Sequence, residues 1–251
     1  MEIQKLYDII ITELEKEAIN KFESKEQFLN WNQAIFENRG YKSYGLSVPE
    51  IDKIVKKYLN KFKDLSFEER IKLTRIFYKS DYIAQTSFGL KLLEISLLEL
   101  KPQKFKILDE ICGYLNHWGP TDSFSLNVMQ PLLKKHPKDV KKLLEQWNNS
   151  DHTWKKRVSV VTFTRKIGAE GKYVDFVLEL SNNLIWEKKD LIRKAVGWAL
   201  KDNMIGNNKK KVLDYVKELR RKGVSSIITL YAIRNLKGKE REEVLKIKPE
   251  K

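Results

Sequence analysis

Residues 66–77, SFEERIKLTRIF, carry the pattern that decides the fold. Ser66 and Glu69 have the S-x-x-E spacing of a capping box, which marks the first residues of a helix. Apolar residues follow at helical spacing, ending with Ile76 and Phe77. The stretch therefore predicts an amphipathic helix that begins directly after Ser66.

The same helical spacing recurs along almost the whole chain, for example in residues 6–18 and 51–59. Short connections with Pro, Gly or Asn separate the helical stretches. About a dozen helices joined in this way pack as pairs, with a period of roughly 35 to 40 residues. We predict an all-α fold, an α-solenoid of roughly six stacked antiparallel helix pairs of the HEAT-like kind, with a concave basic face. An irregular helical bundle is the alternative.

The chain has 251 residues, enough for one large domain or two small ones. We predict a single helical-repeat domain over residues 1–236, followed by a charged, mobile C-terminal tail at 237–251.

The positive charge is concentrated in the second half of the chain. Residues 1–120 hold 19 basic and 18 acidic side chains, whereas residues 121–251 hold 30 and 16. A net charge of +14 in one half attracts polyanions, of which nucleic acid is the commonest in cells. A general lysine bias would have given an even excess.

Several function classes are disfavoured by composition. One cysteine, Cys112, excludes an intramolecular disulfide framework, and we expect it to be a buried apolar residue. Three histidines without i, i+4 spacing give little for a metal site. The apolar stretches are interrupted by charges, and the N-terminal residues do not resemble a signal peptide. We expect a cytoplasmic monomer with no metal, no cofactor and no membrane segment.

Three clusters could carry chemistry. In the first, Pro120 suits a first helical position and places Asp122 near the positive end of the helix dipole, beside Trp118. An ordinary helix start with a packed tryptophan is the alternative. The second and third clusters and a further basic pair combine aromatic side chains with basic ones suited to DNA binding. They are Trp154, Lys155, Lys156 and Arg157, then Arg193, Lys194 and Trp198, and the pair Arg165 and Lys166. For Gly197, which precedes Trp198, close approach of another helix is the simplest explanation.

Together the clusters resemble the AlkD-like DNA alkylation repair glycosylases, a family built from HEAT-like repeats. Three elements in the family's order carry the resemblance: Trp118-Gly-Pro-Thr-Asp122, Trp154-Lys-Lys-Arg157 and Ile192-Arg-Lys-Ala-Val-Gly-Trp-Ala-Leu200. Upstream, Tyr44-Gly-Leu-Ser-Val-Pro49 is similar to the family's helix entry. One position departs from the family, because Phe36, shortly before Gly40, stands near the place of a tyrosine that touches the lesion strand.

The resemblance implies a DNA glycosylase that excises cationic N3- or N7-alkylated purines from duplex DNA, the first step of base excision repair. Asp122 would be the catalytic carboxylate, Trp118 and Trp198 the aromatic walls beside the lesion, and Arg157 a contact to the DNA backbone. The partner would be double-stranded DNA with alkylated bases. The alternatives are a non-catalytic HEAT-like binder of distorted or branched DNA and a protein-interaction solenoid.

Overall fold

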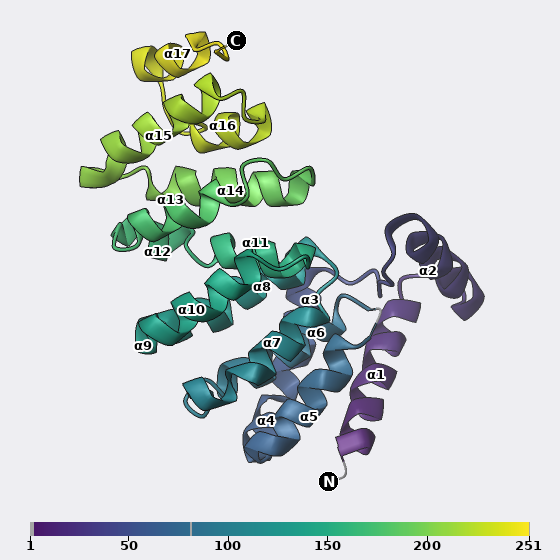
Figure 1. Ribbon diagram of the computed structural model, residues 1–251. Helices are drawn as coiled ribbons and strands as arrows, with labels where there is room; N and C mark the ends of the chain where they lie inside the picture. The colour runs from purple at the N-terminus through teal and green to yellow at the C-terminus, as the bar shows by residue number, and fades with distance from the viewer. Residues whose placement is uncertain (1–2, 81, 251) are drawn as a thin grey trace. The chain divides into compact units, whose positions relative to one another are not determined.

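The computed structural model describes residues 3–80 and 82–250, and helices are the regular elements of this part of the chain (Figure 1). The described residues contain no β-strand, apart from an isolated bridge between Lys42 and Tyr82. The predicted all-α class is therefore confirmed.

The chain divides into two compact units, Met1–Pro120 and Thr121–Lys251. The first unit contains α1 (Ile3–Ile19), α2 (Lys25–Arg39), α3 (Val48–Lys57), α4 (Leu59–Asp64), α5 (Phe67–Tyr78), α6 (Gln85–Ile95), a 3-10 turn (Pro102–Lys104), α7 (Phe105–Gly113) and the start of α8 (Trp118–Phe124). The second unit continues with a π-helical turn (Ser125–Met129), α9 (Gln130–Lys135), α10 (Pro137–Asn148), α11 (Thr153–Val161), α12 (Arg165–Glu170), α13 (Val174–Asn182), α14 (Asp190–Asn203), a 3-10 turn (Gly206–Asn208), α15 (Lys209–Arg221), α16 (Ser226–Ala232) and α17 (Gly238–Lys246).

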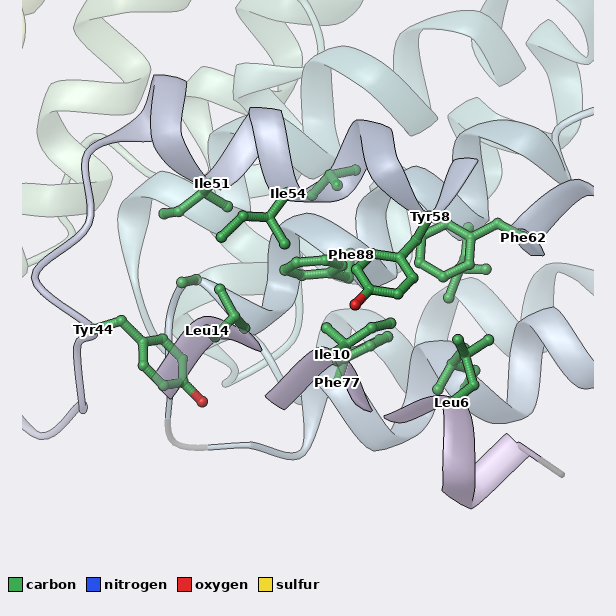
Figure 2. Packing of buried hydrophobic residues seen from close by; sticks show 14 of the residues in the cluster. Leu6, Ile10, Leu14, Tyr44, Ile51, Ile54, Tyr58, Phe62, Phe77 and Phe88 are labelled. Carbon is green, nitrogen blue, oxygen red and sulfur yellow. The ribbon is translucent and has the colours of Figure 1, made fainter. Parts of the chain in front are cut away.

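The core of the first unit forms around one face of α1. Leu6, Ile10 and Leu14 follow one another at four-residue intervals and are fully buried. Figure 2 shows these side chains facing the aromatic rings of Phe77 and Phe88. The ring centroid of Phe77 lies 5.4 Å from that of Phe88 and 5.3 Å from that of Tyr7. The apolar stripe read from the sequence is thus the buried face of the helix.

The capping box at the start of α5 is present as predicted. The backbone N–H of Ser66 donates to Oε2 of Glu69 at 2.8 Å, and the N–H of Glu69 donates to the Ser66 hydroxyl at 3.3 Å. The hydrogen bond from the Ser66 backbone lowers the pKa of Glu69. These bonds satisfy groups that have no partner inside the helix, which fixes where α5 begins.

Ser66→Ala is expected to lower the free energy of unfolding by about 1 kcal/mol, because α5 loses its side-chain cap. Urea denaturation of the full chain measures the change. Ser87→Ala, within α6, is the control and should stay within about 0.5 kcal/mol of the native protein. Equal unfolding midpoints for the two variants would show that the cap has no energetic importance.

In the second unit, helices follow one another as packed neighbours. Helix α10 packs on α11, α11 on α14, and α14 on α16. The side chains at these contacts are large and buried, among them Trp147 of α10 and Val160 of α11. Residues 238–246, inside the tail that we expected to be charged and mobile, form helix α17, which packs on α15 and buries Val244.

Three side-chain contacts join residues that are 35 or 36 positions apart in the sequence. Arg75 binds Glu110 in the first unit, 35 residues away. In the second unit Asn183 donates to Asn148, also 35 residues away, and Lys211 pairs with Asp175, 36 residues away. Equivalent positions of successive helix pairs thus meet one period apart, which agrees with the period of 35 to 40 residues predicted from the sequence.

Candidate functional site

A nearly buried ion pair joins Asp122 of α8 to Arg157 of α11. The Nε and Nη2 atoms of Arg157 donate hydrogen bonds to Oδ1 and Oδ2 of Asp122, both at 2.8 Å. The side chains of Asp122 and Arg157 are only 13% and 7% exposed. Because this two-bond geometry is planar and directional, it fixes the orientation of both carboxylate oxygens.

A third hydrogen bond extends the pair to another helix. Nη1 of Arg157 donates to the backbone carbonyl of Leu191, the second residue of α14. Arg157 therefore joins α8, α11 and α14 within the second unit. Each oxygen of Asp122 can accept two hydrogen bonds, and Arg157 uses one on each. The remaining acceptor positions could orient a water molecule or face a developing positive charge.

The helix that carries Asp122 is irregular. Directly after α8 it widens into a π-helical turn, in which the N–H of Gln130 bonds to the carbonyl of Ser125, five residues earlier. Pro131 explains the change, because proline has no N–H and its ring crowds the carbonyl four residues before it. Such π-turns are frequent at functional sites.

Helix α8 begins earlier than the sequence suggested. We expected Pro120 at the first helical position, but the first helical residue is Trp118. The reason is a local cap, since Nδ1 of His117 accepts a hydrogen bond from the N–H of Gly119 at 3.1 Å. Pro120 still lies in the first turn, where its missing N–H costs nothing. Asp122 follows Trp118 by four residues, about one helical turn.

Trp118 belongs to a row of three rings in the first unit. Its side chain is 52% exposed. The centroid of the His117 ring lies 5.3 Å from that of Trp118 and 4.8 Å from that of Tyr41. Sequence reasoning missed Tyr41, because it precedes His117 by 76 residues and no local pattern links them.

Trp198 of α14 is half-buried, and the guanidinium carbon of Arg165 lies 5.7 Å from the centroid of its ring. Arg165 has a positive φ of 53°, which is unusual for a residue with a side chain. Its backbone N–H donates to Oδ2 of Asp202 at 2.6 Å. This bond holds the start of α12 beside α14, so that Arg165 and Trp198 lie together.

Several of the predicted basic residues surround the connection between α13 and α14. Lys156 forms an ion pair with Glu187, whose backbone carbonyl accepts a hydrogen bond from Nε of Arg193 at 2.6 Å. Arg193 also pairs with Asp190 at 3.2 Å. Lys194, by contrast, is exposed and forms no ion pair with any described residue.

The other predicted contact residues lie on α11 and α12. Trp154 and Lys155 are half-buried in the first turn of α11, one turn before Arg157. Arg165 and Lys166 are exposed at the start of α12. By contrast, Lys156 and Arg193 both bind Glu187 on the connection between α13 and α14.

The described residues contain no group of three or more His, Cys, Asp or Glu side chains that could hold a metal ion. Within the same residues, every helix is too short or too polar to cross a membrane. Cys112 is fully buried, as expected.

Comparisons with known proteins identify the family and the fold of the chain. A family model described as DNA alkylation repair enzyme matches residues 13–236. The chain is also similar to a solved structure from Enterococcus faecalis, described as a predicted DNA alkylation repair enzyme. The two chains have 14% sequence identity and a TM-score of 0.71, over 82% of this chain and 94% of the other. This likeness shows the fold. The search of curated proteins found no match.

Proposed function

Because the chain belongs to the family of DNA alkylation repair enzymes, we propose that it is a DNA glycosylase that excises cationic N3- or N7-alkylated purines from duplex DNA. The observation that carries the proposal is the Asp122–Arg157 pair. It holds a carboxylate in one orientation, with acceptor positions still available, on a helix that the family model covers.

The reaction needs little acid catalysis. Alkylation at N7 or N3 gives the purine a positive charge, so the bond between C1′ and the glycosidic nitrogen is already weakened. When that bond breaks, its electron pair goes to the base, which leaves as a neutral alkylpurine. The deoxyribose acquires oxocarbenium character, as in glycoside hydrolysis.

Asp122 would act on the sugar. Its negative charge would stabilise the positive charge that develops at C1′ and the ring oxygen, and a free acceptor position would orient the attacking water. The water oxygen bonds to C1′, and its proton passes to the carboxylate or to solvent. Arg157 would keep both oxygens in position during this step. It has two further N–H bonds without an acceptor among the described residues, which suit a DNA phosphate.

The aromatic and basic side chains would hold the DNA. Trp118 and Trp198 would contact the cationic nucleotide through their rings, each interaction contributing roughly 0.5 to 2 kcal/mol. DNA contacts are proposed for the residues named from the sequence, which are Trp154, Lys155, Lys156, Arg165, Lys166, Arg193 and Lys194.

The experiment is base release from a duplex that contains a single 7-methylguanine, followed by chromatography of the freed base. The glycosylase proposal predicts release that depends on the protein and leaves an abasic site. Binding of the duplex without any release would instead support the second candidate, a non-catalytic binder of distorted or branched DNA. The small exposed fraction of the Asp122 side chain, 13%, favours that candidate because it restricts the access of a sugar to the carboxylate.

Trp118→Ala is expected to weaken binding of the 7-methylguanine duplex by about 2- to 30-fold, the range for loss of one cation–π contact. Its side chain is exposed, so the free energy of unfolding should change by less than about 0.5 kcal/mol. Fluorescence anisotropy measures the affinity. Val48→Ala, which removes a 70% exposed side chain, is the control. An unchanged preference for the alkylated over the normal duplex would exclude a role of Trp118 beside the lesion.

A further inference from the structure

The connection between α13 and α14, residues 183–189, presents an exposed tryptophan that no proposed role uses. Trp186 is 64% exposed, more than Trp118. Tryptophan is enriched at binding interfaces, because it combines a large apolar ring with a polar N–H. We propose that Trp186 is a second DNA-contacting aromatic residue, which packs on a base or deoxyribose of the bound strand.

The backbone on both sides of Trp186 is fixed. Leu184 and Ile185 are 1% and 5% exposed and anchor the connection in the core. The N–H of Glu187 bonds to the carbonyl of Leu184 at 3.1 Å, which closes a tight turn with Trp186 in it. The Glu187 side chain then pairs with Lys156. The tryptophan is therefore held in place before a ligand arrives, which reduces the entropy lost on binding.

The charges beside Trp186 favour a polyanion. Lys188, Lys189 and Lys194 are all exposed, two on the connection and one in the first turns of α14. Lys188 and Lys194 form no ion pair with a described residue, and Lys189 donates to the hydroxyl of Thr153. A flat apolar ring next to unpaired cations is the combination that holds nucleic acid, because bases stack on the ring while phosphates meet the cations.

The same connection is continuous with the Asp122–Arg157 pair. Arg157 donates to the carbonyl of Leu191, five residues after Trp186. Arg193 and Lys156 both bind Glu187, the residue next to Trp186. A strand that reaches the carboxylate thus lies close to this connection. The inference rests on the proposed function, since it takes DNA as the ligand.

The test compares the affinity of the native protein, Trp186→Ala and Trp186→Phe for a fluorescein-labelled duplex with one 7-methylguanine. We expect Trp186→Ala to raise Kd by about 5- to 150-fold, the range for loss of one base–aromatic stack, and Trp186→Phe to recover most of the affinity. Ile205→Ala is the matched control, because Ile205 is a 48% exposed apolar residue on the connection after α14. It should leave Kd within about twofold of the native value.

The salt dependence of DNA affinity distinguishes the contribution of the Trp186 ring from that of the lysines. The double variant Lys188→Ala, Lys194→Ala should reduce the slope of log K against log salt by about 1.8, or 0.9 for each phosphate contact, whereas Trp186→Ala should leave the slope unchanged.

Each outcome decides separately for the two proposals. If the native protein releases 7-methylguanine and Trp186→Ala binds DNA as tightly as native, the role of Trp186 is wrong and the glycosylase proposal stands. If the native protein binds DNA without releasing the base and Trp186→Ala still weakens binding, the role of Trp186 stands and the glycosylase proposal is wrong.

Discussion

Asp122→Asn is expected to slow release of 7-methylguanine by about 10²- to 10³-fold under single-turnover conditions, the usual loss when one preorganised electrostatic group is removed. The substitution keeps the size of the side chain and removes its negative charge. It also places an amide NH₂ opposite a donor of Arg157, because both Asp122 oxygens now accept from that guanidinium. The variant therefore loses both the charge and the fixed orientation.

The variant should also be less stable, and the measurement has to separate this from catalysis. Leaving one member of a buried ion pair without its partner costs about 3 to 5 kcal/mol. Base release is therefore compared at a temperature at which circular dichroism shows each variant to be folded. A 10²-fold loss of release together with DNA affinity within about threefold of native assigns the effect to the chemical step.

Glu110→Gln is the matched control. Glu110 of α7 accepts hydrogen bonds from Nε and Nη2 of Arg75 at 2.8 to 3.0 Å, so it too is a carboxylate bound by the same two atoms of an arginine. Its side chain is 36% exposed, and nothing in the proposed reaction uses it. The control should keep base release within about twofold of native. Undiminished release by folded Asp122→Asn would exclude the carboxylate mechanism.

Local sequence patterns predicted the features that depend on residues close together in the chain. The capping box of Ser66 and Glu69 and the apolar stripe of α1 both follow from spacings of three or four residues, which the helix itself imposes. The close approach at Gly197 was also predictable, because a glycine inside a helical apolar stripe has few other uses.

Contacts one helix pair apart could not be assigned from local patterns. Arg157 lies 35 residues from Asp122, and the sequence suggested a DNA phosphate as its contact, not the carboxylate that it binds in the structure. The contact of Arg157 with a DNA phosphate stays a prediction. A still larger separation, 76 residues, hid the contact between the rings of Tyr41 and His117. The period was visible in the sequence, but the residues that meet across it depend on the exact rotation of each helix.

Charge counting likewise gave the sign of the field but not its distribution. Acidic partners about one period away pair with several lysines of the second unit, including Lys134 with Glu170 and Lys211 with Asp175. Exposed ion pairs of this kind contribute little to stability, yet they reduce the local positive field. The unpaired lysines beside Trp186 are therefore a smaller and more specific set than the lysine-rich clusters of the sequence.

Gly197→Ala is expected to lower the free energy of unfolding by about 1 to 3 kcal/mol, the usual cost of forcing an extra group into a filled contact. A methyl group at this position would lie 2.6 Å from Cβ of Tyr231 and 2.8 Å from the backbone oxygen of Ile228. Both belong to α16, which packs directly on α14, and a backbone atom cannot rotate away as a side chain can. The clash therefore has to be relieved by moving one helix against the other.

Alanine has a higher helix propensity than glycine, by about 1 kcal/mol, and this stabilisation opposes the cost of the clash. A substitution at a second glycine of the same chain measures the propensity effect alone. Gly113 is the last residue of α7, and a methyl group there would meet no atom within 4 Å. Gly113→Ala should therefore be neutral or more stable than native by up to about 1 kcal/mol in urea denaturation, while Gly197→Ala moves in the opposite direction. Because α14 also carries Trp198 and the Leu191 carbonyl that binds Arg157, its displacement should reduce base release as well. Equal stabilisation by both substitutions would show that α14 and α16 can separate without cost, and that the close contact at Gly197 does not set the position of α14.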